Sequence, residues 1–140
     1  MVIQRIQSVY LLIAAVLMAL VCFVVPVASV ASEDGSSMGI YIYNLPTLFI
    51  LNLLTAVILL ISIFLFKKLK FQMSVVKVCI VLILCSAAIE AVVLYSQVAD
   101  VVINWVGSAL MLLFALVFSF LGLRAIKSDY KLLTSYNRLR

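Results

Sequence analysis

Glu90 is the residue of this sequence best suited to a chemical role, because it is the only acidic side chain inside a long apolar stretch. A carboxylate inside a membrane costs enough free energy to justify a functional hypothesis. Asn52 and Ser108 lie near the corresponding ends of two other apolar stretches, and we expect all three residues at similar depth. They would then form one buried polar cluster. Its functional interpretation is a proton or cation site; the alternative is a glutamic acid that only ties helices together.

Other catalytic chemistry has few residues to draw on. The sequence contains no His, which removes the commonest general base and the commonest metal ligand. Cys22, Cys79 and Cys85 show no C-x-x-C pattern, so neither a thiol-redox motif nor a zinc site is indicated, and we expect these residues to fill packing positions. Four scattered glycines give no phosphate-binding loop. The sequence therefore predicts no catalytic residue, no metal and no cofactor.

The composition identifies the elements that must position these residues. Of the 140 residues, 68% are hydrophobic and 11% are charged, whereas soluble domains carry about 25% charged residues. A helix needs about 20 apolar residues to cross the bilayer core, and four such stretches occur, at about 8–30, 45–66, 74–97 and 102–123. We predict an all-α membrane protein that forms one domain, an antiparallel bundle of four transmembrane helices in sequence order.

The basic residues predict the orientation, because positive charge in short loops stays on the cytoplasmic side. Arg5 precedes the first stretch, four lysines lie around the second connection, and five basic residues follow the fourth stretch. An even number of spans places all ten on one side, so we expect both termini in the cytoplasm. The net charge of +5 then reflects membrane orientation and not a nucleic-acid-binding surface. The lysines at the second connection are Lys67, Lys68, Lys70 and Lys77.

The first apolar stretch has an alternative interpretation as a secretory signal. Arg5, an apolar run and the small residues Ser29 and Ala31 follow one another in the order of a signal and its cleavage site. The run from Val9 to Val25 is longer than the roughly 7 to 15 residues of a signal core, which favours a retained helix. Pro26 lacks an amide donor, and we expect it to bend or end this helix.

Small and polar residues at helical spacing predict the inward face of each span, because helices in lipid associate through close backbone approach and hydrogen bonds. These residues are Ser8, Ala15, Ala19 and Cys22 in the first span, Asn52, Thr55 and Ala56 in the second, Cys79, Ser86, Glu90 and Gln97 in the third, and Asn104, Ser108, Ala115, Ser119 and Gly122 in the fourth.

The basic tail, residues 124–140, is predicted to form a short amphipathic cytoplasmic C-terminal helix that continues from the fourth span. Such a segment could bind anionic lipid or dock onto a protein partner; the alternative is a solvated charged face that only fixes orientation. Four basic residues recur on one side, namely Arg124, Lys127, Lys131 and Arg138. The apolar residues on a different side are Ile126, Tyr130 and Leu133.

The two ends of the chain resemble a known family. The opening IQRIQSVYLL (residues 3–12), the closing RAIKSD (124–129) and the final NRLR (137–140) resemble the ends of small four-span inner-membrane proteins of Bacteroidota catalogued as domain of unknown function 4293. The resemblance extends over the chain in length and span order. It implies a bacterial inner-membrane location and four spans, and it supplies no activity. Where members of the family carry further acidic residues after Asp129, this chain has Tyr130 and Lys131.

The functional expectation follows from how little chain remains outside the lipid bilayer. We expect a non-enzymatic accessory or scaffold subunit that binds another membrane protein, or a second copy in a homo-oligomer, through its spans or basic tail. The alternative is a small proton-coupled transporter that uses Glu90. Such a protein would be similar in size and span count to the small multidrug-resistance exporters, whose glutamate lies in the first span instead of the third. An intramembrane enzyme is disfavoured because no His supplies a base.

Overall fold

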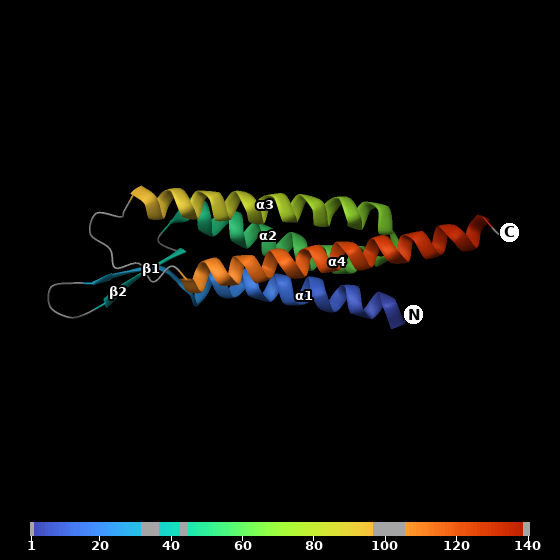
Figure 1. The fold of residues 1–140 in the computed structure, drawn as a ribbon, viewed down its shortest axis with the longest axis horizontal. Helices are drawn as coiled ribbons and strands as arrows, with labels where there is room; N and C mark the ends of the chain where they lie inside the picture. Colours follow the sequence, from blue (N-terminus) through green and yellow to red (C-terminus); the bar gives the residue numbers. More distant parts are fainter. Residues whose placement is uncertain (1, 32–36, 43–44, 97–105, 139–140) are drawn as a thin grey trace.

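The computed structural model describes residues 2–31, 37–42, 45–96 and 106–138 of the chain. Long helices make up most of these residues, and one small β-hairpin lies between the first two (Figure 1). In chain order the elements are α1 (Val2–Phe23), β1 (Pro26–Ala31), β2 (Ser37–Tyr41), α2 (Pro46–Phe64), the 3-10 turn η2 (Leu65–Lys67), α3 (Leu69–Ser96) and α4 (Val106–Arg138).

Each long helix contains a stretch that is long and apolar enough to cross a membrane. The chain is therefore a multi-pass membrane protein, and the prediction of an all-helical bundle with four spans is confirmed. The four stretches are Ile6–Phe23, Pro46–Lys67, Leu69–Val93 and Gly107–Tyr136.

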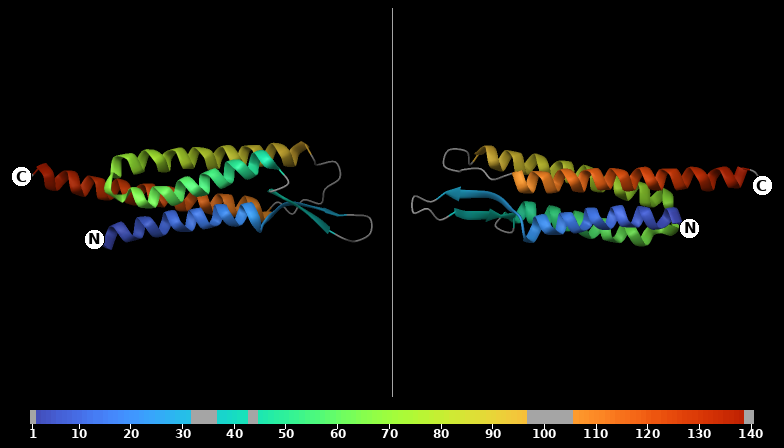
Figure 2. Two further views of the ribbon diagram at one scale, coloured as in Figure 1. Left: turned by 180° about the vertical axis from the view of Figure 1, so that it is seen from behind. Right: turned by 60° about the horizontal axis from the view of Figure 1, so that its bottom comes forward.

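The four helices pack as an antiparallel ring. Contacts join α1 to α2, α2 to α3, α3 to α4 and α4 back to α1, so α1 is a full member of the bundle. Both ends of the chain lie at the same end of the bundle as the α2–α3 turn, whereas the hairpin lies at the other end (Figures 1 and 2). We call these the basic end and the hairpin end. The order of the helices follows from short connections, which place consecutive helices side by side.

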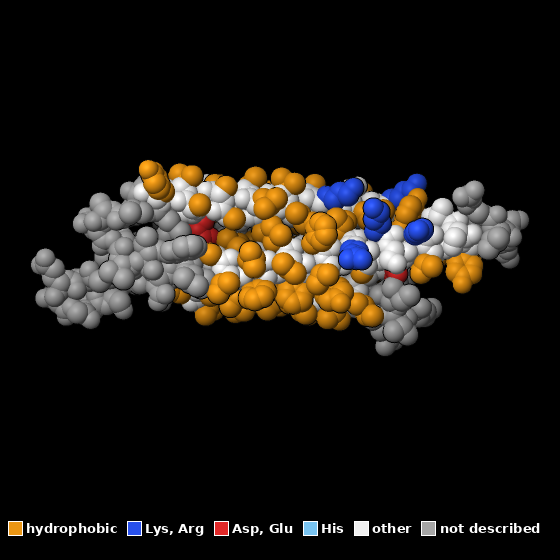
Figure 3. Space-filling model, in the orientation of Figure 1, with side chains coloured by type: hydrophobic (Ala, Val, Ile, Leu, Met, Phe, Trp, Pro, Cys, Tyr) orange, Lys and Arg blue, Asp and Glu red, His pale blue; other side chains and the backbone are white. Residues whose placement is uncertain are grey.

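The bundle is apolar on both its inside and its outside, as the membrane requires. Leu11, Met18 and Ile83 are among the fully buried core residues, while many large apolar side chains face outward (Figure 3). The predicted inward faces are confirmed where the side chains are described. Asn52, Thr55, Ala56, Cys79, Ser86, Ser108, Ala115, Ser119 and Gly122 are all buried. Ser8 and Ala19 are half-buried, whereas Gln97 and Asn104 lie outside the described residues.

The hairpin corrects the sequence-based boundary of the first span. Helix α1 ends at Phe23, before the predicted end at residue 30, and β1 pairs antiparallel with β2. Pro26 explains the change because it cannot donate the amide hydrogen bond that a helix interior needs. The valines that follow it suit a strand as well as a helix, since β-branched side chains favour extended backbone. The expectation that Pro26 ends this helix is therefore confirmed.

The C-terminal tail also differs from the prediction, because it is not a separate short helix. Helix α4 runs without a break over 33 residues, Val106–Arg138, which at 1.5 Å per residue is about 50 Å. It therefore exceeds the bilayer core of about 30 Å. The tail contains no Pro or Gly to end the helix, and Ile126 is fully buried against the bundle. The fourth span and the tail therefore form one continuous helix, and the packing of Ile126 stabilises the part beyond the predicted span.

Candidate functional site

Glu90 and Ser108 meet at the hairpin end, on the facing sides of α3 and α4. The Ser108 hydroxyl donates a hydrogen bond to Oε1 of Glu90. Ser108 is fully buried, and Glu90 is only 3% exposed. The second carboxylate oxygen of Glu90, Oε2, has no hydrogen-bond partner among the described residues. Oε2 of Glu90 can therefore accept a hydrogen bond from another group when the carboxylate is ionised, or donate one when the carboxyl is protonated.

The register of α3 against α4 explains why these two residues meet. Near the basic end, the Lys70 ammonium lies 5.6 Å from the centre of the Tyr130 ring. Counting from that contact at 1.5 Å per residue, Glu90 lies about 30 Å along α3 and Ser108 about 33 Å along α4. The two helices are antiparallel and neighbouring, so the two distances end at the same level. Ser86, one turn before Glu90, satisfies its own hydroxyl by donating to the Ile83 carbonyl at 2.8 Å.

Glu90 lines a cavity of about 320 Å³ between α3 and α4, which we call the α3/α4 groove. Its walls are apolar apart from the carboxylate, and exposed residues at its rim open it toward the lipid. The lining residues are Ile83, Leu84, Ala87, Glu90, Ala91, Ala109, Leu112, Leu113 and Leu116. Three of them are alanines, so the backbones of both helices lie close to the surface of the groove.

Asn52 does not join the Glu90–Ser108 pair. It is fully buried in α2, and neither its amide nitrogen nor its amide oxygen has a hydrogen-bond partner in the described part of the chain. Near the basic end, the Gln72 amide donates to the Ser62 carbonyl at 3.0 Å and so fixes α2 against α3. From this contact, Asn52 lies about 15 Å along α2 and Glu90 about 27 Å along α3 at 1.5 Å per residue.

The predicted three-residue cluster is therefore reduced to a pair. The estimate of equal depth assumed that the second and third apolar stretches end at one level at the hairpin end. Helix α3 is in fact longer, with 28 residues against 19 in α2. Glu90 lies near Val93, at the outer limit of the apolar stretch of its helix, while Asn52 lies deeper in the bundle.

Buried polar residues near the basic end were missing from the sequence-based candidates. Gln7 and Gln72 are almost fully buried, and each leaves one amide atom without a hydrogen-bond partner among the described residues. Asp129 is only 6% exposed, although it lies among the charged residues of the tail. The sequence signal was present, because each glutamine stands next to an apolar stretch. The predicted span boundaries excluded both.

The basic tail residues are exposed where the structure describes them. Arg124, Lys127 and Lys131 lie on the surface of α4, whereas the structure does not describe the side chain of Arg138. The residues of the predicted apolar stripe become more exposed toward the C-terminal end of α4. Ile126 is buried and Tyr130 is half-buried, but Leu133 is 52% exposed.

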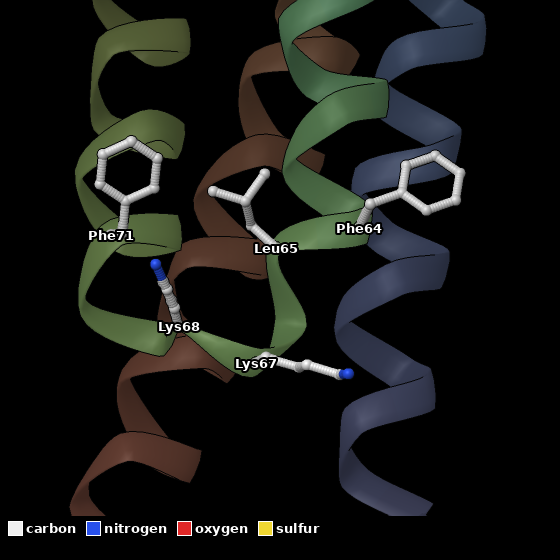
Figure 4. A pocket seen from close by; sticks show the side chains of 5 residues that line it. All are labelled: Phe64, Leu65, Lys67, Lys68 and Phe71. Carbon is white, nitrogen blue, oxygen red and sulfur yellow. The ribbon is translucent and has the colours of Figure 1, made fainter.

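A second candidate site lies at the α2–α3 turn, where sequence reasoning used the lysines only to predict orientation. A cavity of about 400 Å³, which we call the turn pocket, is lined by Phe64, Leu65, Lys67, Lys68 and Phe71 (Figure 4). A neighbouring hollow of about 590 Å³, which we call the notch, lies between this turn and α4. The notch is lined by Lys67, Lys68, Leu69, Lys70, Phe71, Tyr130, Leu133 and Thr134.

These features limit the available chemistry. In residues 2–31, 37–42, 45–96 and 106–138, His, Cys, Asp and Glu form no group of three or more that could hold a metal ion. Cys22 and Cys79 are buried and Cys85 is exposed, and all three are free thiols. The Glu90–Ser108 pair can accept a proton, a cation or a hydrogen-bond donor. The lysines at the turn can bind an anion.

Comparison with known proteins gives one match. The model of the family described as Domain of unknown function (DUF4293) matches residues 3–139. No curated protein matches the chain. No solved structure matches it either.

Proposed function

The chain belongs to the family described as Domain of unknown function (DUF4293), and from this premise we propose that it is a non-enzymatic membrane subunit that binds a transmembrane helix of another membrane protein. The α3/α4 groove is the observation that carries this proposal. It combines an apolar hollow open to lipid with a carboxylate oxygen, Oε2 of Glu90, that lacks a hydrogen-bond partner within the described residues.

The composition of the groove favours a helix as its occupant. Ala87, Ala91 and Ala109 are small enough for the backbone of another helix to approach closely, which is how helices associate in lipid. Leu84 and Leu113 at the rim supply packing surface on either side. A buried polar atom without a partner costs about 1–3 kcal/mol. A hydroxyl or amide on the partner helix would recover that free energy at Glu90.

The proposed location is the bacterial inner (cytoplasmic) membrane, with both termini in the cytoplasm. Ten Lys and Arg residues support this orientation, since all of them lie before the first span, around the α2–α3 turn or from Arg124 onward. We further propose that the exposed tail residues Arg124, Lys127 and Lys131, together with Arg138, contact anionic lipid or the same partner.

Site-specific photo-crosslinking in the native membrane tests the proposed interface. A photoreactive amino acid at Ala91 or Leu113 lies on the groove, whereas Val16 and Leu60 are exposed on α1 and α2 and serve as matched controls. We expect one reproducible protein adduct from the groove positions, identified by mass spectrometry, and none from the controls. An adduct at twice the mass of the chain would identify a second copy as the partner. Equal adducts at all four positions would contradict the proposal.

The second candidate function is a small proton-coupled transporter, and the burial of Glu90 beside a cavity favours it. Glu90→Gln keeps the shape of the side chain and removes its ionisation, so it isolates the proton from the packing. If the chain transports protons, reconstituted vesicles will show proton-dependent uptake that Glu90→Gln abolishes and that Ser119→Ala, a buried substitution on the same α4 helix as Ser108, retains. If the chain is an accessory subunit, Glu90→Gln will change the crosslink yield and leave no uptake signal to lose.

A further inference from the structure

We propose that the α2–α3 turn binds the phosphate group of an anionic phospholipid, with an acyl chain lying along Phe64 and Phe71. The turn pocket and the notch together form this site. The site lies at the basic end, far from the α3/α4 groove, and it does not depend on the function proposed for that groove. The cations of this site are also distinct from those of the basic tail, because Arg124, Lys127 and Lys131 line neither hollow.

Charge is the first argument for an anionic occupant. Lys67, Lys68 and Lys70 are consecutive or nearly so, and all three are exposed. Among the described residues the only nearby carboxylate is Asp129, which is 6% exposed and so presents almost no negative surface. Figure 3 shows Lys and Arg side chains gathered at this end of the molecule. The site therefore presents positive charge that the described surface does not neutralise.

The arrangement of the side chains is the second argument. In Figure 4, Lys68 extends beside α3 toward the ring of Phe71, and Lys67 extends in the other direction, toward α1. The Leu65 side chain lies between those of Phe71 and Phe64 and adds a further apolar surface to the pocket. The rings of Phe64 and Phe71 are 78% and 57% exposed. Two ammonium groups thus flank a hollow whose aromatic walls continue into the lipid-facing surface.

The notch adds a third cation and a second wall. Helix α4 continues past the α2–α3 turn, so Tyr130, Leu133 and Thr134 face the turn across the notch (Figure 1). The Lys70 ammonium lies 5.6 Å from the centre of the Tyr130 ring, within the range of a cation–π interaction. This contact holds Lys70 at the edge of the notch. Lys67, Lys68 and Phe71 line both hollows, so an anion there meets the cations of both.

The combination of cations and exposed aromatic rings favours a phospholipid over a soluble anion. A free phosphate would make no apolar contact with Phe64 or Phe71. In a phospholipid, an acyl chain can cover both rings while the phosphate group remains at the level of the lysines. Basic pockets at the end of transmembrane helices are known binding sites for anionic lipid headgroups. The volumes of about 400 and 590 Å³ are also in the range of small-molecule sites.

Lipid binding to the purified full chain in detergent tests this proposal. The probes are phosphatidylglycerol, phosphatidylcholine with matching acyl chains, and inorganic phosphate, with binding followed by native mass spectrometry and thermal unfolding. We expect phosphatidylglycerol to bind and to raise the unfolding temperature, and the other two to have little effect. Equal binding of phosphatidylcholine would overturn the anion preference. Equal stabilisation by inorganic phosphate would identify a soluble-anion site instead.

Charge-matched variants locate the site. We expect Lys68→Gln to weaken phosphatidylglycerol binding about fivefold, whereas Lys77→Gln, which removes the same charge from an exposed position of α3 that lines neither hollow, changes it less than twofold. The substituted lysines are all exposed, so both variants should fold, and circular dichroism checks this. Phe64→Ala/Phe71→Ala should weaken binding and preserve the preference for phosphatidylglycerol. A loss with Lys77→Gln alone, or an equal loss with both lysine variants, would overturn the proposal.

Discussion

At the scale of single residues, the hydrogen bond from Ser108 to Glu90 joins two buried side chains of neighbouring helices. Ser108→Ala leaves both oxygens of a buried carboxyl without this donor, and we expect it to lower the free energy of unfolding by about 1 kcal/mol. Chemical unfolding in micelles, followed by circular dichroism, measures the change.

Ser119 provides the control on the same helix. Its hydroxyl is buried and has no hydrogen-bond partner among the described residues, so Ser119→Ala removes a polar group that gains nothing from the fold. We expect this substitution to be neutral or slightly stabilising. If Ser119→Ala destabilises the chain as much as Ser108→Ala, the stability comes from packing and not from the hydrogen bond.

Replacing Asn52 should stabilise the chain, in contrast to replacing Ser108. Two polar atoms buried without partners among the described residues cost free energy, and leucine has the same branched skeleton without polar atoms. We therefore expect Asn52→Leu to raise the unfolding temperature of the purified monomer. A lower unfolding temperature, together with a change in oligomeric state by light scattering, would show that the Asn52 amide binds a second chain in the assembled protein.

At the scale of elements, the contact between α1 and α4 depends on Gly122. A Cβ atom at this position would lie 3.0 Å from Cδ2 and 3.3 Å from Cγ of Leu11. Gly122→Val places a branched side chain in that space and forces the two helices apart, so we expect a loss of about 1–3 kcal/mol in the free energy of unfolding.

Gly107 is the matched control for this substitution. A Cβ atom there would lie 3.5 Å from Cγ1 of Val25, which is an ordinary contact distance. Gly107→Ala should therefore be tolerated, with little change in the free energy of unfolding. Thermal unfolding of both variants makes the comparison. Equal destabilisation by the two changes would contradict the close approach at Gly122.

The helices were predictable from the sequence because a membrane imposes one simple requirement, a run of about 20 apolar residues. The hairpin was not, because hydropathy alone cannot separate a strand from the end of a helix. The valines after Pro26 extend an apolar run whichever conformation they adopt. The continuous α4 was also missed in part, because the basic residues from Arg124 onward suggested a new element, whereas the buried Ile126 ties them to the same rod.

The candidate site was likewise predictable only in part from the sequence. Glu90 and Ser108 were found together because both lie on the small and polar face of their spans, and helical spacing predicts such faces well. The depth of Asn52 was not predictable, since it depends on where one helix ends relative to its neighbour. The notch was missed because it forms from residues of several elements, and Tyr130 lies far from Lys70 in the sequence.

At the scale of the whole molecule, the two ends of the bundle differ in charge and in shape. The basic end carries the exposed lysines of the α2–α3 turn and of α4, and α4 continues beyond it. The hairpin end carries the Glu90–Ser108 pair and the strands. A molecule with one cationic end has a preferred orientation in a membrane, because moving cations across the bilayer during insertion is costly.

This asymmetry predicts the topology of the chain. A reporter fused before Met1 and a second fused after Arg140 should both lie in the cytoplasm, since an even number of spans separates them. An epitope inserted between β1 and β2 should lie on the opposite side of the membrane. Reporter activity in intact cells, together with epitope access before and after permeabilisation, measures all three positions.

Charge variants then test the cause of that topology. Replacing Lys67, Lys68 and Lys70 with Gln removes the cations at the central turn, and the termini retain theirs. If the cations set the orientation, this variant should show a mixed population in which a fraction of the epitope becomes cytoplasmic. Reporters at the two termini that lie in different compartments would contradict the four-span bundle itself. An orientation unchanged by the variant would assign the bias to the tail of α4, where Arg124 and the basic residues that follow it remain.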